Sequence, residues 1–395
     1  MNPTGVPADP PSSQGSTLES SLPDFLGGEK LEEGIGLCLS GGGYRAMLFH
    51  LGAFRRLNEL GVLSKLDRVA SVSGGSIAAG ALAVAWDELT FDGGGRATNF
   101  DVKVAAPILA LSMKRIDVLA ILLGVLPFVN GAARAAAAYD KFLFGGKSLQ
   151  DLPDHPRFSF TATSLQSGVL WRFAKEYAAD WRVGRWSSPQ LSVASVVAAS
   201  AAFPPYLSPA YVDVPASAIA SQLGSDLTGD GFTRRLCLTD GGVYDNLGLE
   251  PVWKRYKTIL VSDGGAVTPP LPRVKTSWLG LAMRTTDIAL QQGINMRRRV
   301  LLGMHQSGQR KVAYWSVSDP VDRYGVGNPM NFSSAQSRTA ASMPTRLTRF
   351  DAGLRECVMR AGYAHCDAAL RGSGIVPGID KSAPVLPNLD GPLSG

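Results

Sequence analysis

The chain reads SGGGYR at residues 40–45, directly after a short apolar run at residues 35–39, and a helical pattern follows over residues 44–60. A strand that ends in a glycine turn and continues as a helix leaves backbone N–H groups free at the helix start. Such groups bind negative charge, either a phosphate or the oxyanion of an acyl-transfer reaction. No Gly-Lys-Ser/Thr follows, which argues against a nucleotide-binding loop.

The same arrangement of strand and glycine turn recurs twice further along the chain. RVASVSGG at residues 68–75 contains Ser73, and RLCLTDGG at residues 235–242 contains Asp240. Three strands that each end in a glycine turn can bring a serine, a carboxylate and free N–H groups to one edge of a sheet. Those are the groups that an acyl-transfer enzyme needs.

Ser73 fits the nucleophile of a tight strand-to-helix turn. Such a turn needs small residues two positions before and after the nucleophile, because the backbone segments crowd there. Ser71 and Gly75 fill these positions. Ser76 also has small neighbours but falls inside the predicted helix, and a serine that only caps that helix is the simplest alternative.

Asp240 ends a predicted strand and precedes Gly241 and Gly242, so it is a candidate base for the serine proton in a partly dry site. Asp263 also follows a predicted strand and precedes two glycines, and either aspartate alone is consistent with a turn. Arg45 has three interpretations: it orients the glycine loop, binds an anionic substrate group, or lies on the surface.

A Ser-His-Asp enzyme would need one of the four histidines of the chain. None of them stands in a distinctive local motif, so the triad remains the less favoured alternative. The histidines are His50, His155, His305 and His365.

Composition indicates a folded protein with a sizeable core, since 45% of the 395 residues are hydrophobic and 18% are charged. The net charge of +6 favours contact with anionic surfaces, and the one basic cluster lies at residues 297–299. We expect peripheral contact with an anionic membrane and no nucleic-acid partner, because no nucleic-acid-binding signature occurs. The four cysteines lack metal-site spacing, so we expect no metal and no cofactor. With no visible signal peptide, we expect a cytoplasmic protein.

Alternating strand and helix patterns predict an α/β fold with a mostly parallel central sheet flanked by helices on both faces. We expect a disordered leader (1–30), a single domain (31–371) with a helical, apolar insertion around 100–150, and a flexible tail (372–395). The uninterrupted apolar run 118–129 is too short to span a bilayer and predicts either a buried hairpin or an interfacial lid. Expected strands are 35–39, 69–72, 158–163, 169–173, 236–239, 258–262 and 312–317; expected helices are 44–60, 76–89, 193–202, 277–303 and 347–370.

Taken in order, these blocks resemble the patatin-like phospholipases, over roughly residues 34–265. Residues 41–45 resemble the oxyanion motif of that family, and residues 71–75 its Gly-x-Ser-x-Gly elbow, with Ser71 in place of the first glycine. Residues 199–206 resemble a further family block, and residues 240–246 resemble the Asp-Gly-Gly block with its trailing Asp-Asn.

The resemblance implies a patatin-like α/β/α sandwich and a Ser–Asp dyad without histidine. Ser73 would be the nucleophile and Asp240, rather than Asp263, the base. The implied substrates are acyl esters of phospholipids and related lipids, hydrolysed without a metal. Two alternatives stay open: a non-catalytic lipid-binding or scaffolding protein, and a Ser-His-Asp esterase. The implied oxyanion donors are the amides of Gly41, Gly42 and Gly43, with Arg45, Gly75, Gly241 and Gly242 in support.

Overall fold

The structure is a computed structural model that carries all side chains of the residues it describes. The predicted leader, the apolar run 118–129 and most of the predicted tail lie outside these residues, and the division into domains stays a prediction. The described residues are 31–114, 131–205, 207–265, 267–274, 276–326, 330–345, 349–376 and 379.

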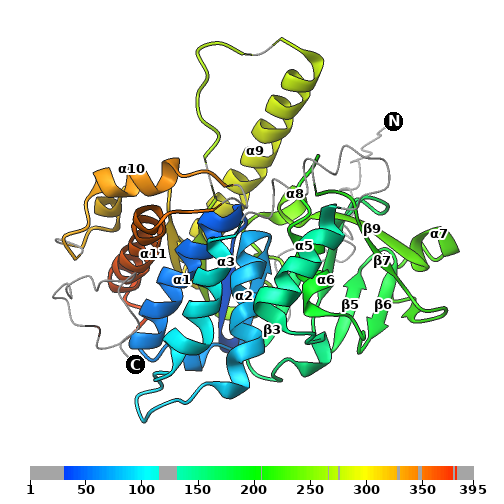
Figure 1. Cartoon of the computed structure of the whole chain (residues 1–395), viewed down its shortest axis with the longest axis horizontal. Coiled ribbons are helices and arrows are strands. Elements are labelled where there is room, and N and C mark those ends of the chain that lie inside the picture. The colour runs from blue at the N-terminus through cyan, green and yellow to red at the C-terminus, as the bar shows by residue number, and fades with distance from the viewer. Residues whose placement is uncertain are drawn as a thin grey trace, which may run out of the picture.

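A mostly parallel sheet forms the centre of the molecule, as predicted (Figure 1). Five neighbouring strands in the order β11-β10-β1-β2-β3 all run parallel. Their bounds are β1 (Glu32–Leu39), β2 (Arg68–Val72), β3 (Arg157–Ser164), β10 (Tyr256–Asp263) and β11 (Lys311–Ser316).

The remaining strands are antiparallel to their neighbours, and of these only the ones at residues 170–173 and 235–240 were expected from the sequence. The others are short and lack a clear alternation of apolar and polar residues. These strands are β4 (Leu170–Phe173), β5 (Tyr177–Asp180), β6 (Gly184–Ser187) and β8 (Ile219–Ala220), while β7 (Ala210–Asp213) pairs with β9 (Arg235–Asp240).

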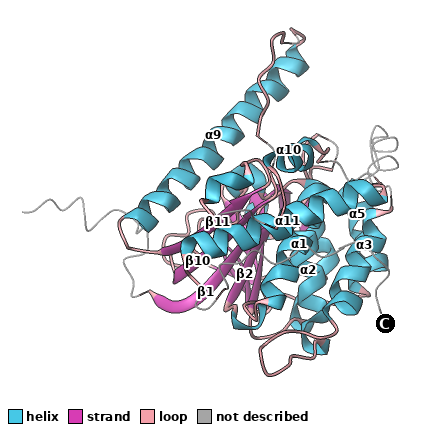
Figure 2. Cartoon of the chain, turned by 90° about the vertical axis from the view of Figure 1, so that its left-hand side faces the viewer, coloured by secondary structure: helices cyan, strands magenta, loops and turns pink. Residues whose placement is uncertain are grey.

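Helices cover both faces of the sheet (Figure 2). Alternate residues of a strand point to opposite faces, and in β1 Leu37 joins the core beneath α1, α2 and α11 whereas Cys38 packs on the other side with Leu301 of α9. The predicted layered architecture is therefore confirmed. The helices are α1 (Gly43–Glu59), α2 (Gly74–Ala85), α3 (Ala106–Ser112), α5 (Gly131–Tyr139), α6 (Val193–Ser200), α7 (Asp230–Thr233), α8 (Gly242–Asp245), α9 (Trp278–Gln306), α10 (Ser334–Ser342) and α11 (Ala352–Ser373).

The helix that follows the glycine loop is buried on nearly all sides, because α11 crosses it closely. A methyl group added at Gly52 would overlap the carbonyl oxygen of Met359, and one added at Gly362 would overlap that of Phe49. The two glycines thus permit a backbone approach that fixes α1, and with it the glycine loop, against the core. Within the described residues, no helix combines the length and apolar character needed to cross a bilayer.

Candidate active site

Ser73 occupies the sharp turn between β2 and α2. Its backbone has φ 51° and ψ −120°, a conformation that costs a non-glycine residue about 1–3 kcal/mol. The turn packs tightly against the glycine loop: a methyl at Gly74 would overlap the carbonyl oxygen of Gly43, and one at Gly75 would overlap that of Leu39. The sequence-predicted need for small residues around Ser73 thus has a direct steric cause.

Asp240 reaches Ser73 because β2 and β9 meet end to end along one edge of β3. The other edge of β3 is taken by β4, which pairs Trp171 with Ala162. On the shared edge, β2 pairs with β3 as far as Thr161, and β9 continues from Ala162, the partner of Asp240. Since β9 is antiparallel to β3, Asp240 approaches Ser73 from the opposite direction, a feature that the three similar sequence patterns did not indicate.

Burial controls the acidity of Asp240, whose side chain is almost fully enclosed. Loss of solvation raises the pKa of Asp240 to about 6, while hydrogen bonds from the Ser73 hydroxyl and the Gly242 amide oppose that rise. The Gly242 N–H donates to Oδ1 at 2.7 Å. The Oδ2 atom has no partner of good hydrogen-bond geometry among the described residues, so the Ser73 hydroxyl lies near the carboxylate without being fully aligned on it.

Asp263, the alternative aspartate, has both carboxylate oxygens engaged in other hydrogen bonds. One of its oxygens accepts the Gly265 amide at 2.9 Å, and the other accepts the Tyr314 hydroxyl at 2.5 Å. It does not line the pocket that Ser73 and Asp240 share. Two similar Asp-Gly-Gly turns therefore border the same pocket, through Gly242 and Gly265, but of the two aspartates only Asp240 lines it.

The three glycines of the loop differ in whether their amides are available. The Gly41 N–H donates to the carbonyl oxygen of Asn246 at 3.0 Å. No acceptor for the amides of Gly42 and Gly43 is present among the described residues, and Gly43 begins α1, where helix N–H groups are free. Of the three glycines predicted as oxyanion donors, Gly42 and Gly43 therefore remain as candidates, because the Gly41 amide is already bonded.

Gly43 needs to be glycine for two reasons, its φ of 58° and its close approach to Thr345. We expect Gly43→Ala to lower the free energy of unfolding by about 3 kcal/mol or more, because backbone strain and overlap with the Thr345 carbonyl add. Gly145 is a matched control, with φ 55° and open space around it. Its alanine variant should cost only about 1–2 kcal/mol. Equal losses in denaturant unfolding would contradict the overlap argument.

The Arg45 side chain is buried and does not line the pocket. Its guanidinium donates to the Gly264 carbonyl at 3.2 and 3.0 Å, and to the carbonyls of Ala341 and Met343 at 3.0 and 2.9 Å. Burial lowers the pKa of Arg45 to about 10. Of the three sequence interpretations, the structure supports the loop-orienting one, and it does so through residues more than 200 positions away in the chain.

A chain of buried serine hydroxyls supports the turn beneath Ser73. The Ser73 N–H donates to Ser200 Oγ at 3.0 Å, and Ser200 Oγ lies 2.8 Å from Ser76 Oγ. The Ser76 hydroxyl in turn donates to Ser71 Oγ at 3.0 Å. Ser71, the departure from the family pattern, thus has a hydrogen-bonding role. Ser76, the alternative nucleophile, is fully buried within this network.

Ser200 does not line the pocket, so its influence on Ser73 is indirect. We expect Ser200→Ala to cost about 1–3 kcal/mol of stability, because the Ser73 amide loses its acceptor. We also expect a lower kcat on a soluble ester with little change in KM. Ser195→Ala, at a half-buried position of the same helix outside the serine network, is the control and should cost no more than about 0.5 kcal/mol. Wild-type kcat and stability in Ser200→Ala would show that the network is dispensable.

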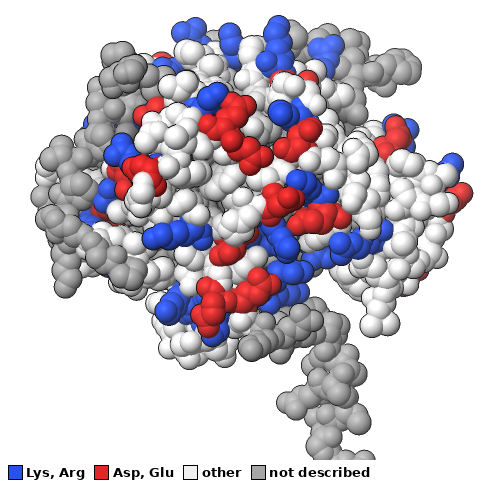
Figure 3. Space-filling model, turned by 90° about the horizontal axis from the view of Figure 1, so that it is seen from below, with Lys and Arg blue, Asp and Glu red and all other residues white. Residues whose placement is uncertain are grey.

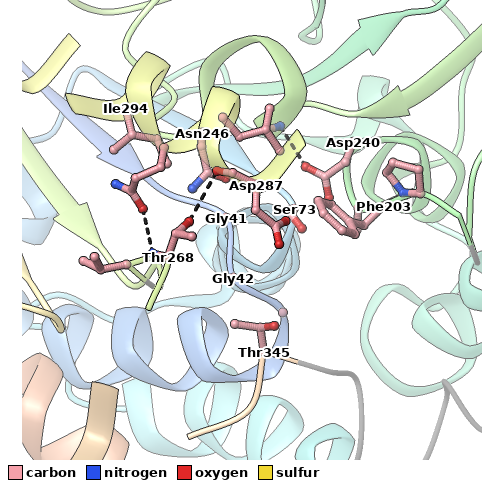
Figure 4. A pocket seen from close by; sticks show the side chains of 18 of the residues that line it. Gly41, Gly42, Ser73, Phe203, Asp240, Asn246, Thr268, Asp287, Ile294 and Thr345 are labelled. Atoms are coloured by element: carbon pink, nitrogen blue, oxygen red, sulfur yellow. Dashed lines mark hydrogen bonds between the residues drawn. The ribbon is translucent and has the colours of Figure 1, made fainter. Parts of the chain in front are cut away.

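Ser73 and Asp240 open into a pocket of about 460 Å³ (Figure 4). The glycine loop forms one side, and the opposite side comes from α9 and from the loop that precedes it. Sequence reasoning missed these walls and also missed Asn246, although that residue lies in a quoted family block. The apolar lining includes Phe203, Leu207, Val267, Met283, Leu290 and Ile294.

None of the four histidines lines the pocket. His50 is buried between Ser262 Oγ at 2.8 Å and the Ser40 carbonyl at 2.9 Å, and burial lowers its pKa to about 4. His365 is likewise buried, and its pKa falls to about 3. Among the described residues, no cluster of His, Cys, Asp and Glu suited to a metal ion occurs.

Fold and site together define an α/β/α protein in which a strand-to-helix serine elbow, a strand-end aspartate and a glycine loop share one apolar pocket. Comparison with protein-family models identifies the family: the patatin-like phospholipase model matches residues 37–253, more than half of the chain. The protein belongs to that family, as the sequence motifs indicated. A sequence search against curated proteins returned no match.

Solved structures with a similar fold include human GIVD cytosolic phospholipase A2, at 12% identity and a TM-score of 0.46, covering 88% of this chain and 64% of that one. The same enzyme in complex with methyl gamma-linolenyl fluorophosphonate gives 14% identity and a TM-score of 0.47, covering 86% and 59%. VipD from Legionella pneumophila is 16% identical in sequence, with a TM-score of 0.37, and the match covers 87% of this chain and 67% of VipD. The chain thus spans less than two thirds of the human enzyme.

Proposed function

We propose that this protein is a serine-dependent lipid acyl hydrolase that cleaves carboxylic esters of phospholipids or related lipids. The observation that carries the proposal is the meeting of Ser73 and Asp240 in one apolar pocket, where β2 and β9 abut. An apolar pocket favours an acyl chain, and Ser73 and Asp240 stand together in its wall, where an ester carbonyl would react. Membership of the patatin-like phospholipase family supports the same substrate class.

The proposed reaction has two steps. Asp240 takes the proton of the Ser73 hydroxyl as Oγ attacks the ester carbonyl, and the amides of Gly42 and Gly43 stabilise the oxyanion. Collapse expels the alcohol part of the lipid, which takes the proton from Asp240, and leaves an acyl group on Ser73. Asp240 then takes a proton from water, which attacks the acyl-enzyme and releases a fatty acid, and the proton returns to Ser73.

Burial of Asp240 suits this role. A carboxylate with an ordinary pKa is a weak base. The raised pKa of about 6 lies closer to pH 7, which makes Asp240 a stronger base while its carboxyl group stays mostly ionised at that pH. The strained backbone of Ser73 keeps its hydroxyl at the turn, exposed to the pocket rather than bonded to the start of α2.

Labelling with a long-chain fluorophosphonate tests the proposal, because the reagent bonds only to an activated serine. We expect one adduct per chain, located on Ser73 by peptide mass spectrometry, together with fatty-acid release from mixed-acyl phospholipids. A protein that binds lipid vesicles but neither reacts nor hydrolyses any ester would instead be the lipid-binding alternative. The Ser-His-Asp alternative is not favoured, since no histidine lines the pocket.

Peripheral contact with an anionic membrane and a cytoplasmic location stay part of the proposal. Of the two features that first suggested membrane contact, the apolar run 118–129 lies outside the described residues and stays a prediction, whereas the basic cluster at residues 297–299 is largely paired. Arg297 contacts Asp245 at 3.3 Å and Arg298 contacts Asp319. The basic cluster therefore gives such a contact little support.

A further inference from the structure

The first turns of α9 project away from the body of the protein, as Figures 1 and 2 both show. Their apolar side chains are unusually open to solvent: Trp278 is 80% exposed, Leu279 51% and Leu281 44%. We call these three residues the α9 tip. Exposed apolar groups that gather at one place mark a binding surface more often than scattered single residues do.

The apolar side chains of the α9 tip point in several directions around the helix. Successive helical residues are about 100° apart, so Trp278 and Leu281 share one face, whereas Leu279 lies about 160° around the helix from Leu281 and widens the apolar surface beyond one stripe. A partner protein or a second copy of this chain would cover a single stripe and leave the rest exposed. A lipid phase surrounds an inserted helix end on all sides, and therefore fits the α9 tip better.

The charged residues nearest to the α9 tip in the sequence are basic, and the first acidic one, Asp287, lies nine positions after Trp278. Residues 266–286 contain Arg273, Lys275 and Arg284 but no Asp or Glu. The helix N-terminus adds further positive potential at the same end. The opposite face of the molecule instead shows acidic and basic residues side by side (Figure 3). The α9 tip therefore combines apolar groups with a local excess of positive charge, which matches an anionic lipid surface.

The α9 tip also lies next to the pocket. Met283, Leu290 and Ile294 of the same helix line the pocket wall, and Met283 is only about 7 Å along the helix axis from Trp278. The preceding loop joins the wall as well, since Thr268 N–H donates to Gln291 Oε1 at 3.1 Å. A membrane that received the α9 tip would face the pocket mouth directly.

We infer that the α9 tip inserts into the surface of an anionic membrane and places the pocket mouth where a lipid can enter it. This inference rests on the proposed function only for the substrate; membrane binding by itself does not require an active serine. The indole ring of Trp278 would lie at the level of the headgroups, where tryptophan is enriched in membrane proteins.

Vesicle co-sedimentation in a Ser73→Ala background tests the inference without digestion of the vesicles. We expect binding to vesicles of phosphatidylcholine mixed with phosphatidylglycerol, and weaker binding to phosphatidylcholine alone. The double variant Trp278→Asp, Leu279→Asp should bind the mixed vesicles at least about tenfold less tightly, since two inserted apolar side chains are lost. Leu223→Asp is the matched control, because Leu223 is fully exposed and far from the pocket walls.

Two outcomes would overturn the inference: unchanged binding of the double variant to the mixed vesicles, or a dimer in the parent protein that the same double variant abolishes. Activity separates this inference from the proposed function. With Ser73 intact, the double variant should lose hydrolysis of vesicle lipid but keep hydrolysis of a soluble short-chain ester. If the wild type hydrolyses no ester, the proposed function fails, while the binding assay still decides the role of the α9 tip.

Discussion

Ser73→Ala is expected to lower kcat/KM for ester hydrolysis by about 10⁴-fold or more, because the acyl-enzyme cannot form. The fold should be unaffected. The Ser73 side chain makes no cap hydrogen bond to α2, and alanine tolerates its backbone conformation no worse than serine does. Thermal unfolding of the variant should therefore match wild type within about 0.5 kcal/mol.

Two further variants sharpen this test. Ser76→Ala removes a buried serine only three positions away that supports the turn but does not line the pocket, and should therefore cost far less activity than Ser73→Ala. Ser73→Gly should be as inactive as Ser73→Ala yet about 1 kcal/mol more stable, since glycine accepts a φ of 51° without strain. Substantial hydrolysis by Ser73→Ala would disprove the proposed nucleophile.

Asp240→Asn is expected to lower kcat/KM by about 10³-fold or more, because an amide cannot take the Ser73 proton. In the wild type, activity should fall as the pH drops below about 6, where Asp240 becomes protonated. A pH profile of kcat/KM on a soluble ester measures this limb directly. Asp263→Asn is the matched control, and its folded fraction should keep most of the activity and the same acidic limb.

Asp240→Asn should also stabilise the protein at neutral pH. Burial raises the pKa of Asp240 from 3.8 in the unfolded chain to about 6 in the folded one. The folded state therefore holds its proton more tightly, and stability from this group is fully present below pH 3.8 and lost as the pH rises through about 6. Asp240→Asn removes that loss, so we expect a gain of about 1–3 kcal/mol at pH 7. Lower stability with unchanged activity would contradict both roles.

Much of the candidate site could be predicted because its parts are local. Gly43 and the Ser73 turn have positive φ, and the residue types that tolerate such turns stand together in the sequence. The parallel strands could also be predicted, because each is marked by a local apolar run. Strands β5 to β8 and helix α10 were not predicted, because their stability comes from neighbouring elements rather than from their own pattern.

The sequence by itself determined the strand-to-helix turns, the candidate serine and aspartate, and membership of a patatin-like family, since each depends on residues within a few positions. Tertiary structure alone decided that Asp240 meets Ser73 from a strand antiparallel to β3, that the Gly41 amide is bonded to the Asn246 carbonyl, and that Arg45 binds backbone carbonyls across the fold. It also placed α9 as both pocket wall and projecting tip. These features arise from contacts between segments far apart in the chain, and local sequence patterns do not report which distant segment will pair with them.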